Sequence, residues 1–252
     1  MRFLLHTTPS PAEDLALEEA IHTCVEDGLS PNTWRVWQAA APAVVLGTGQ
    51  EAAKEVDLNA ARAEQVPVLR RHSGGGAVLI GPGVVSYSAF YLLKDLPGSE
   101  TIRGAMSAAL RPVLQVLRTW GLQTCEAGLS DVAVAGGDGG LRKIAGNAQA
   151  RKKKSAVVHG TLLADPDWGR IARLLRPPSS APDYRAGRDH RAFLTSLREA
   201  GVPHELQPFA DALARALQPA MPVEQAPSAE EQQRAARLLE EKYAQQEWNL
   251  RR

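Results

Sequence analysis

The chain has 252 residues, of which 44% are hydrophobic, and its formal net charge is +1. This length supports a sizeable core in one large domain or two small ones, and the near-neutral charge gives no global indication of a nucleic-acid partner. The first ten residues are too short and polar for a signal peptide and no apolar run approaches the roughly 20 residues of a membrane span, so we expect a cytoplasmic protein without membrane contact.

The first half of the chain alternates predicted helices with β-like runs. A helix over 10–27 begins with a capping box, in which Ser10 is the cap, Pro11 fits the first turn and Glu13 completes the box. Two further helices are predicted at 57–64 and 100–119. The β-like runs stand at 33–38, 43–47, 66–70, 77–80 and 84–93.

The second half predicts hairpins followed by helices. Its strands and turns are 129–135, 136–140 (glycine-rich turn), 141–149, 151–154 (basic turn) and 156–164. From residue 167 onward the pattern is mostly helical, with a linker at 222–228 before a last helix at about 229–245. Strands paired through short hairpins, with helices grouped before and after them, predict an α+β fold with a mainly antiparallel sheet.

Cysteines and histidines are few and scattered. Cys24 and Cys125 are far apart in the sequence, and no two of the six histidines have the spacing of paired metal ligands. We therefore expect neither a disulfide framework nor a structural metal site.

Arginines and glycines combine in the segment that runs from Arg70 and Arg71 through Ser73 to Gly74–Gly76 and Ala77. Consecutive glycines let the backbone approach a ligand closely, and their N–H groups can form an anion-binding nest. The two arginines would add charge for a carboxylate or phosphate; the alternative is a hairpin with its arginines in solvent. Neither G-x-G-x-x-G nor a Gly-Lys pair is present, which excludes the Rossmann fingerprint and the Walker A loop.

Two later segments contribute a lysine and a histidine. Lys143 falls on a predicted strand beside Ile144 and Ala145, so its ammonium should be partly buried and need a counter-charge such as a ligand phosphate or carboxylate. The alternative is a lysine that reaches solvent at a sheet edge. His159 precedes Gly160, and a glycine within a strand often marks the close approach of a ligand. A histidine satisfied within the core is the alternative there.

Taken in order, these segments resemble the lipoate–protein ligase A family, within the biotin and lipoate protein ligase superfamily. The resemblance spans nearly the whole chain. Its motifs are D-L-A-L-E-E at 14–19, R-R-H-S-G-G-G-A-V at 70–78, R-K-I-A-G-N-A-Q at 142–149, H-G-T-L-L at 159–163, and K-Y with W-N at 242–249. The chain departs from the family pattern at Ala145, at Val158 and in the turn at 80–83.

The resemblance implies a single catalytic domain over 1–252, with a central mixed sheet flanked by helices, a C-terminal helical segment at about 229–245 and no accessory C-terminal domain. It also implies that lipoate or octanoate reacts with ATP, in the presence of Mg²⁺, to give an acyl-adenylate. A lysine of a lipoyl domain would then take the acyl group. The acceptors would be lipoyl domains of 2-oxoacid dehydrogenase complexes or the glycine cleavage H protein, and some short members of the family also need a separate accessory protein.

The resemblance further assigns roles to individual positions. Lys143 would be the catalytic residue, contacting the acyl carbonyl and the α-phosphate. The loop Ser73–Ala77 would wrap the acyl-adenylate, and Arg71 would help to hold its carboxyl or phosphate end. The other substrate-binding positions would be Arg70, Asn147, Ala148, His159, Gly160 and Thr161. Asp131 would be a Mg²⁺ ligand near the nucleotide.

The nearest alternative is an octanoyl or lipoyl transferase on the same fold, which holds the acyl group on a cysteine as a thioester and needs no ATP. Cys125 falls in a predicted loop before the strand at 129–135, where such a nucleophile could sit. Its neighbours do not resemble the C-F-x-x-P-S context of those transferases, and Glu126 would raise the pKa of the thiol if it lay close. The sequence therefore favours the ligase.

Other functions are less favoured by the sequence. A serine hydrolase would use Ser73, Asp131 and His159, but Ser73 lacks the G-x-S-x-G elbow. A biotin ligase would carry a loop like G-R-G-R-x-G-R, and a non-catalytic acyl-binding partner subunit would not need Lys143. The basic turn Lys152–Lys154 is either a solvated turn or a docking point for an acidic lipoyl domain.

Overall fold

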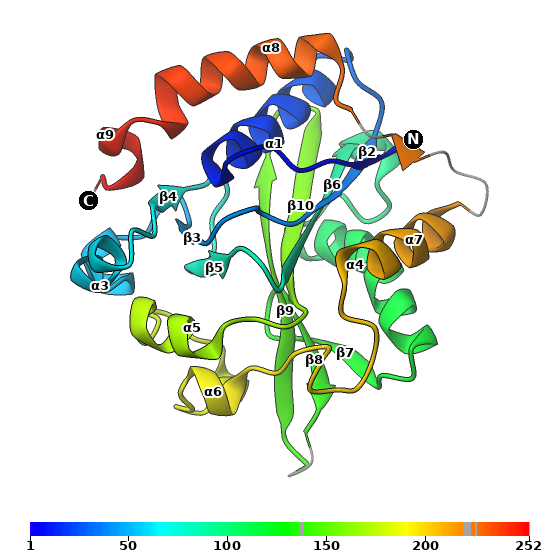
Figure 1. Ribbon diagram of the computed structural model, residues 1–252. Helices are drawn as coiled ribbons and strands as arrows, with labels where there is room; N and C mark the ends of the chain where they lie inside the picture. The colour runs from blue at the N-terminus through cyan, green and yellow to red at the C-terminus, as the bar shows by residue number, and fades with distance from the viewer. Residues whose placement is uncertain (137–138, 219–222, 225, 252) are drawn as a thin grey trace.

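The computed structural model describes residues 1–136, 139–218, 223–224 and 226–251, so parts of the predicted turn at 136–140 and of the predicted linker at 222–228 lie outside the described residues. The described strands form an eight-stranded and a three-stranded sheet (Figure 1). In spatial order, the large sheet consists of β11 (Val223–Glu224), β1 (Arg2–Leu5), β2 (Thr33–Trp37), β6 (Val84–Leu92), β10 (Ser155–Leu163), β9 (Leu141–Arg151), β8 (Asp131–Ala135) and β7 (Thr124–Ala127).

Strand directions make both sheets mixed. In the large sheet β1 runs parallel to β2 and β11, and the other neighbours are antiparallel. In the small sheet the central β3 (Ala43–Leu46) is parallel to β4 (Val68–Arg70) and antiparallel to β5 (Val78–Ile80). The predicted α+β fold, with a mixed and mainly antiparallel central sheet, is confirmed.

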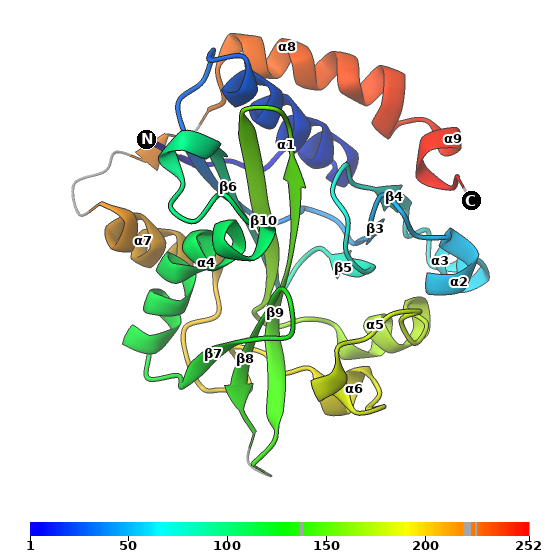
Figure 2. The same cartoon turned by 180° about the vertical axis from the view of Figure 1, so that it is seen from behind.

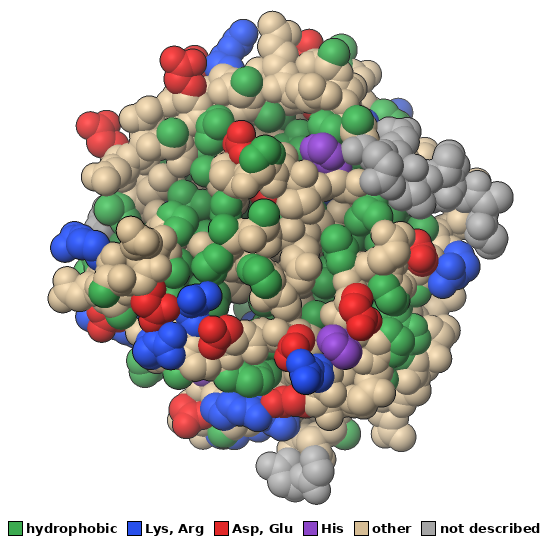
Figure 3. Space-filling model, viewed as in Figure 1, with side chains coloured by type: hydrophobic (Ala, Val, Ile, Leu, Met, Phe, Trp, Pro, Cys, Tyr) green, Lys and Arg blue, Asp and Glu red, His purple; other side chains and the backbone are tan. Residues whose placement is uncertain are grey.

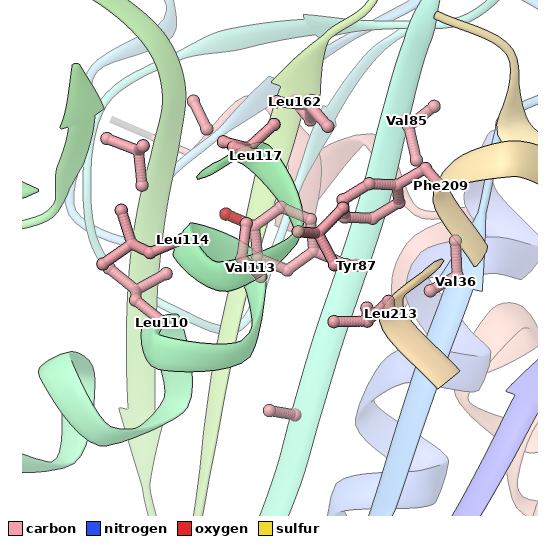
Figure 4. Packing of buried hydrophobic residues seen from close by; sticks show 14 of the residues in the cluster. Val36, Val85, Tyr87, Leu110, Val113, Leu114, Leu117, Leu162, Phe209 and Leu213 are labelled. Atoms are coloured by element: carbon pink, nitrogen blue, oxygen red, sulfur yellow. The ribbon is translucent and has the colours of Figure 1, made fainter. Parts of the chain in front are cut away.

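Helices cover both faces of the large sheet. On one face α1 (Pro11–Glu26) buries Leu17 and Ile21 against the sheet, and α8 (Ala229–Leu238) lies beside α1 (Figures 1 and 2). On the other face lie α4 (Ile102–Thr119) and α7 (Leu206–Leu217). Figure 4 shows side chains of these two helices packed around Tyr87 of β6. Among the described residues, no helix combines the length and the apolar character that crossing a bilayer requires.

Shorter elements surround the small sheet and the ends of the large one. They are α2 (Ala52–Glu55), α3 (Leu58–Ala63), α5 (Trp168–Leu174), α6 (His190–Phe193), α9 (Gln246–Asn249), the 3₁₀ helices η1 (Leu93–Asp95) and η2 (Asp183–Arg185), and the π-helical η3 (Leu239–Tyr243). The capping box of Ser10 and Glu13 is present at α1. The helix predicted at 229–245 is α8 followed by the π-helical turn η3, a change of winding that the apolar periodicity did not indicate.

One predicted loop is a strand. Cys125 was expected in a loop before the strand at 129–135, but residues 124–127 form β7, paired antiparallel with β8. Gly128 has a φ of 58°, a conformation that glycine adopts readily, and it helps to turn the chain tightly enough for the two strands to pair. The pairing fixes the face of the sheet toward which the Cys125 side chain points.

Candidate active site

A cavity of about 900 Å³ lies between the α1-covered face of the large sheet and the small sheet. Its walls come from β6, β9 and β10, from Gly75–Ala77, and from the segment 176–183 together with residues of α5 and α6. Leu15, Trp37 and Ile80 supply part of an apolar lining. On the face seen in Figure 3, charged side chains gather around α5 and α6. The cavity thus joins an apolar portion to a charged rim.

The buried guanidinium of Arg71 forms hydrogen bonds with the glycine-rich segment, here Ser73–Ala77. Its Nε donates to Ser73 Oγ at 3.0 Å, and its Nη2 donates to the carbonyl oxygens of Gly74 and Gly76 at 2.5 and 2.9 Å. Burial lowers the pKa of Arg71 to about 10, so it remains a cation at neutral pH. Arg71 borders the cavity as predicted, but these donors go to the loop itself. Its hydrogen bonds therefore fix the conformation of the loop, and its positive charge lies at the cavity wall.

A second anchor of the segment is a hydrogen-bonded chain from Ser73 through His159 to Glu18. Ser73 Oγ lies 2.6 Å from His159 Nε2, and His159 Nδ1 lies 3.0 Å from Glu18 Oε2. Burial alone would raise the pKa of Glu18, but its contacts with His159 and Arg35 and its bond from Ser88 lower it to about 2. Because the carboxylate is ionised, the Nδ1–H of His159 donates to it, and Nε2 is the ring nitrogen that bonds the Ser73 hydroxyl.

This chain has the connectivity of a hydrolase triad, with Glu18 where Asp131 was considered. Ser73 is only 1% exposed, and the described lining of the cavity does not include it. A nucleophile must reach its substrate, so we assign these three hydrogen-bonded residues to anchoring the loop rather than to hydrolysis.

A β-bulge directs Lys143 into the cavity. Val132 and Ala133 of β8 pair with Ala145 and Lys143, which leaves Ile144 as the extra residue of β9. Ile144 and Ala145 consequently both enter the core on the α4 side, while Lys143 borders the cavity. The lysine side chain lies over Gly146, where a Cβ would come within 2.5 Å of Nζ.

The counter-charge of Lys143 is Asp131. Lys143 Nζ lies 2.8 Å from Asp131 Oδ1, and the Tyr184 hydroxyl donates to Asp131 Oδ2 at 2.8 Å. Both carboxylate oxygens are therefore engaged, and Mg²⁺ prefers free carboxylate oxygens. No cluster of three potential metal-ligating side chains occurs among the described residues. In this arrangement Asp131 does not fit the predicted role of Mg²⁺ ligand.

Other predicted positions meet along β9 and β10. Asn147, Ala148, His159, Gly160 and Thr161 all border the cavity. Asn147 Oδ1 accepts from the Tyr87 hydroxyl and its Nδ2 donates to Ser130 O at 2.7 Å, so the amide is fixed in one orientation. A Cβ at Gly160 would come within 2.0 Å of Asn147 Oδ1, which explains the glycine.

Arg70 lies elsewhere. Its side chain is buried and donates to backbone carbonyl oxygens, including those of Gly47, Gln50 and Trp248, and the described lining of the cavity does not include it. Arg70 faces away from its neighbour Arg71 because consecutive side chains of an extended backbone alternate. The structure thus gives Arg70 a role in supporting the backbone rather than in direct contact with a ligand.

Cys125 shares a sheet face with Lys143. Cys125 pairs with Ala133, and Ala133 pairs with Lys143, and directly paired side chains project to the same face. The described lining of the cavity nevertheless does not include Cys125. Glu126 projects to the opposite face, where it accepts from Ser107 of α4 at 2.6 Å. The condition under which Glu126 would raise the pKa of the thiol, a position close to it, is therefore not met, because side chains alternate along β7.

Sequence reasoning missed the roles of Glu18 and Tyr184. Glu18 stood inside the D-L-A-L-E-E motif but received no role, although a carboxylate within an apolar helix face signals a buried partner. Tyr184 follows a proline-rich loop and carries no sequence signal of its own.

Comparison with known proteins is consistent with this fold and site. A sequence model of the lipoyl protein ligase A/B catalytic domain matches residues 10–218. The chain belongs to this family of lipoate ligases and octanoyltransferases, and it is an enzyme of that superfamily.

Curated relatives carry both activities in their names. Octanoyltransferase LipM of Symbiobacterium thermophilum is 31% identical over 97% of this chain and 95% of its own length. A putative lipoate-protein ligase A of Aeropyrum pernix is 33% identical over 69% of this chain and 62% of its own.

Solved structures of ligases share the fold. A bi-partite lipoate protein ligase of Thermoplasma acidophilum, described with its E2 lipoyl domain, has a TM-score of 0.83 and 25% identity, covering 99% of this chain and 95% of that one. A lipoate-protein ligase A bound with ATP has a TM-score of 0.82 and 25% identity, covering 99% and 98%.

Proposed function

We propose that the enzyme activates lipoate or octanoate with ATP and transfers the acyl group to a lysine of a lipoyl domain. The observation that carries this proposal is that the Lys143 ammonium and the backbone of Gly75–Ala77 border the same cavity. A cavity of about 900 Å³ is near the upper end of the range for small-molecule sites, so it can hold more than an eight-carbon chain.

Both chemical steps develop negative charge on oxygen. In the first, the acyl carboxylate attacks the α-phosphorus of ATP and pyrophosphate leaves. In the second, the neutral acceptor amine attacks the acyl carbonyl, AMP leaves, and the amine loses a proton. The ammonium of Lys143 and the backbone N–H groups of the glycine-rich segment would serve as hydrogen-bond donors in both steps. Asp131 would orient the Lys143 side chain through this ion pair, as a positioning residue.

The acceptor is expected to enter at the charged rim. The acyl carbonyl must lie near Lys143, so the acceptor lysine has to reach the same point from solvent. The basic turn Lys152–Lys154 is a poor candidate for the docking point, because Lys152 stands nine positions after Lys143 along an extended strand, a span of about 30 Å. Lys152 Nζ is also bonded to Thr23 Oγ1 at 2.7 Å.

A specific observation favours a second function, the ATP-independent transferase. Cys125 lies on the Lys143 face of the sheet, and LipM relatives match 97% and 99% of the chain. In this reaction the Cys125 thiolate would attack the acyl thioester of a carrier and release the carrier thiol. The acceptor amine would then displace Cys125 from the new thioester. Because Cys125 is outside the cavity lining that the structure describes, this reaction requires a local movement that brings the thiol and the bound acyl group together.

Supplying the acyl group in two forms separates the two functions. The wild type, Cys125→Ser and Lys143→Gln would each be incubated with a lipoyl domain and either lipoate with ATP or octanoyl carrier protein without ATP. The ligase predicts lipoate-dependent pyrophosphate exchange, and acyl transfer that survives Cys125→Ser. The transferase predicts transfer without ATP that Cys125→Ser abolishes. Absence of transfer by the wild type in both arms, with and without an accessory protein, would contradict both functions and favour a non-catalytic subunit.

A further inference from the structure

The segment Gln246–Arg251, here called the C-terminal strap, lies along the free edge of the small sheet. Strand β4 is at that edge and ends at Arg70. The Arg70 N–H donates to Asn249 Oδ1 at 3.0 Å, and the Arg70 carbonyl accepts from Trp248 Nε1 at 2.8 Å. Two strap side chains therefore satisfy the backbone groups that a neighbouring strand would otherwise pair.

The Arg70 side chain continues the connection. On the strap side its Nε donates to Trp248 O at 3.1 Å and its Nη2 donates to Arg251 O at 2.8 Å. On the other side its Nη1 donates to Gly47 O at 2.8 Å and Gln50 O at 2.7 Å. One guanidinium thus joins the strap to the turn at 47–50. Its five donors suit this because they lie in a rigid plane.

The turn at 47–50 in turn touches the glycine-rich segment. Thr48 N–H donates to Ser73 O at 2.8 Å. A Cβ placed on Gly47 would lie only 2.1 Å from the carbonyl oxygen of Gly75, so the two backbones are in direct contact. Since Gly75 borders the cavity, a continuous path of contacts runs from the strap to the cavity wall.

We propose that Trp248 and Asn249 are positioning residues for the glycine-rich segment and so control how well the site retains the activated acyl group. Neither residue belongs to the cavity lining that the structure describes. An effect on the reaction therefore passes to the turn through Arg70, or through Arg251, whose Nη2 donates to Thr48 Oγ1 at 2.8 Å. A displacement of the segment by about 1 Å can cost 10²-fold in rate, and a segment that opens also admits water to the intermediate. This inference rests on the acyl-transfer function proposed above.

The path predicts a particular kinetic defect. Trp248→Phe removes the indole donor and keeps an aromatic ring, which packs with Arg251 and Lys242. Asn249→Ala removes the acceptor for Arg70 N–H and also the amide that donates to Tyr243 O at 2.8 Å. The double variant should lower the yield of acyl-lysine per activated acyl group about tenfold, because loss of both side-chain bonds to the Arg70 backbone frees the segment to open. Hydrolysed acid and AMP should account for the difference. Glu247→Gln, at an exposed position of the same helix α9, is the matched control.

A second measurement keeps the inference testable even if the enzyme does not turn over. Amide hydrogen exchange reports local opening, so the amides of Gly74–Gly76 should exchange about tenfold faster in the double variant than in the Glu247→Gln control, without substrate. The proposal would be overturned if the double variant showed both an unchanged exchange rate of the Gly74–Gly76 amides and an unchanged yield of acyl-lysine per activated acyl group. Equal acceleration throughout the chain, with a matching fall in Tm, would also overturn it, since the strap would then stabilise the whole fold. Absence of turnover in the wild type would count against the proposed function, while the exchange result would still decide the role of the strap.

Discussion

The two walls of the cavity are built in different ways. The glycine-rich wall is held by buried side chains that bond to backbone: Arg71 inside the segment, Arg70 behind it, and Ser73 through His159. The opposite wall, formed by the mostly exposed residues 176–189, is held nearer the surface. Its side-chain bonds include those from Tyr184 to Asp131, from Ser179 to Glu55 and from Arg188 to the Leu141 carbonyl. Because exposed segments open at lower free-energy cost than buried ones, we expect the first wall, here called the rigid wall, to be the more fixed, and the second, here called the mobile wall, to open more readily.

The two candidate reactions use the two walls differently. Both need fixed donors for a developing oxyanion, and the rigid wall and Lys143 supply these. Only the transferase needs Cys125, which lies on the Lys143 face of the sheet, near Tyr184 of the mobile wall. Substitutions in the rigid wall should therefore damage either reaction, and substitutions in the mobile wall should have smaller effects that depend on the reaction.

The largest effect is expected at Lys143, the charged group on which both reactions depend. Lys143→Gln should lower acyl transfer by about 10³-fold, or ~4 kcal/mol of transition-state stabilisation, since a charged donor to the oxyanion is lost. Transfer to a lipoyl domain, followed by intact mass, measures this. Lys153→Gln, on the exposed basic turn, is the control and should retain wild-type transfer. A variant with more than a tenth of wild-type activity would show that the ammonium is not central.

The rigid wall can be tested with two glycines of one turn. A Cβ at Gly47 would meet the Gly75 carbonyl oxygen at 2.1 Å, whereas a Cβ at Gly49 meets nothing within 4 Å. Gly47→Ala should therefore displace the glycine-rich segment and lower transfer by about 10²-fold, or ~3 kcal/mol. Gly49→Ala should transfer like the wild type. Similar kinetics for the two variants would mean that the wall adapts, and the contrast between the walls would be lost.

The sequence predicted the site best at residues that lie within recognisable motifs. The motif residues Lys143, Asn147 and His159 were expected together and do border one cavity. The bulge at Ile144 was not predictable, because it depends on pairing with β8, which no local pattern encodes. For the same reason the adjacent Arg70 and Arg71 looked equivalent in the sequence, although one holds backbone and the other faces the cavity.

The anchor of the rigid wall through Glu18 predicts a pH signature. Glu18 has a pKa of about 2 in the folded state and a reference value of 4.5, so its contribution is fully present above pH 4.5 and is lost as the pH falls toward 2. Glu18→Gln should lower the unfolding free energy at neutral pH by about 2 kcal/mol, the cost of losing hydrogen bonds from charged partners. It should also remove this part of the acid dependence.

Two histidines provide the reference for that measurement. They are His22 and His72, whose burial lowers the pKa of each imidazole to about 3; the charge of His72 also acts on His22. The wild type and the Glu18→Gln variant should therefore both lose stability as the pH falls from 6.5. Urea unfolding at pH 7, 5 and 3 would separate the two contributions. The curves should run parallel above pH 4.5 and converge below it. Curves that remain parallel down to pH 3 would show that Glu18 is not the ionised anchor.

The smallest effect is expected in the mobile wall. Tyr184→Phe removes the hydroxyl that donates to Asp131 Oδ2 and keeps the ring, whose centroid lies 5.1 Å from that of Phe193. Asp131 would then bond Lys143 without its second partner, and the 176–189 segment would lose a contact to β8. A neutral hydrogen bond is worth about 1 kcal/mol, so we expect transfer with ATP to fall about fivefold.

The same variant sharpens the contrast between reactions. If the mobile wall shields Cys125, loosening it should leave ATP-independent transfer unchanged or raise it, while ATP-dependent transfer falls. Tyr91→Phe, whose hydroxyl bonds Trp34 away from the cavity, is the matched control and should alter neither rate. If Tyr184→Phe lowered the rate of acyl transfer by 10²-fold or more, Tyr184 would belong with the rigid wall. A side chain that only fastens a movable segment should affect the rate less than one that orients Lys143.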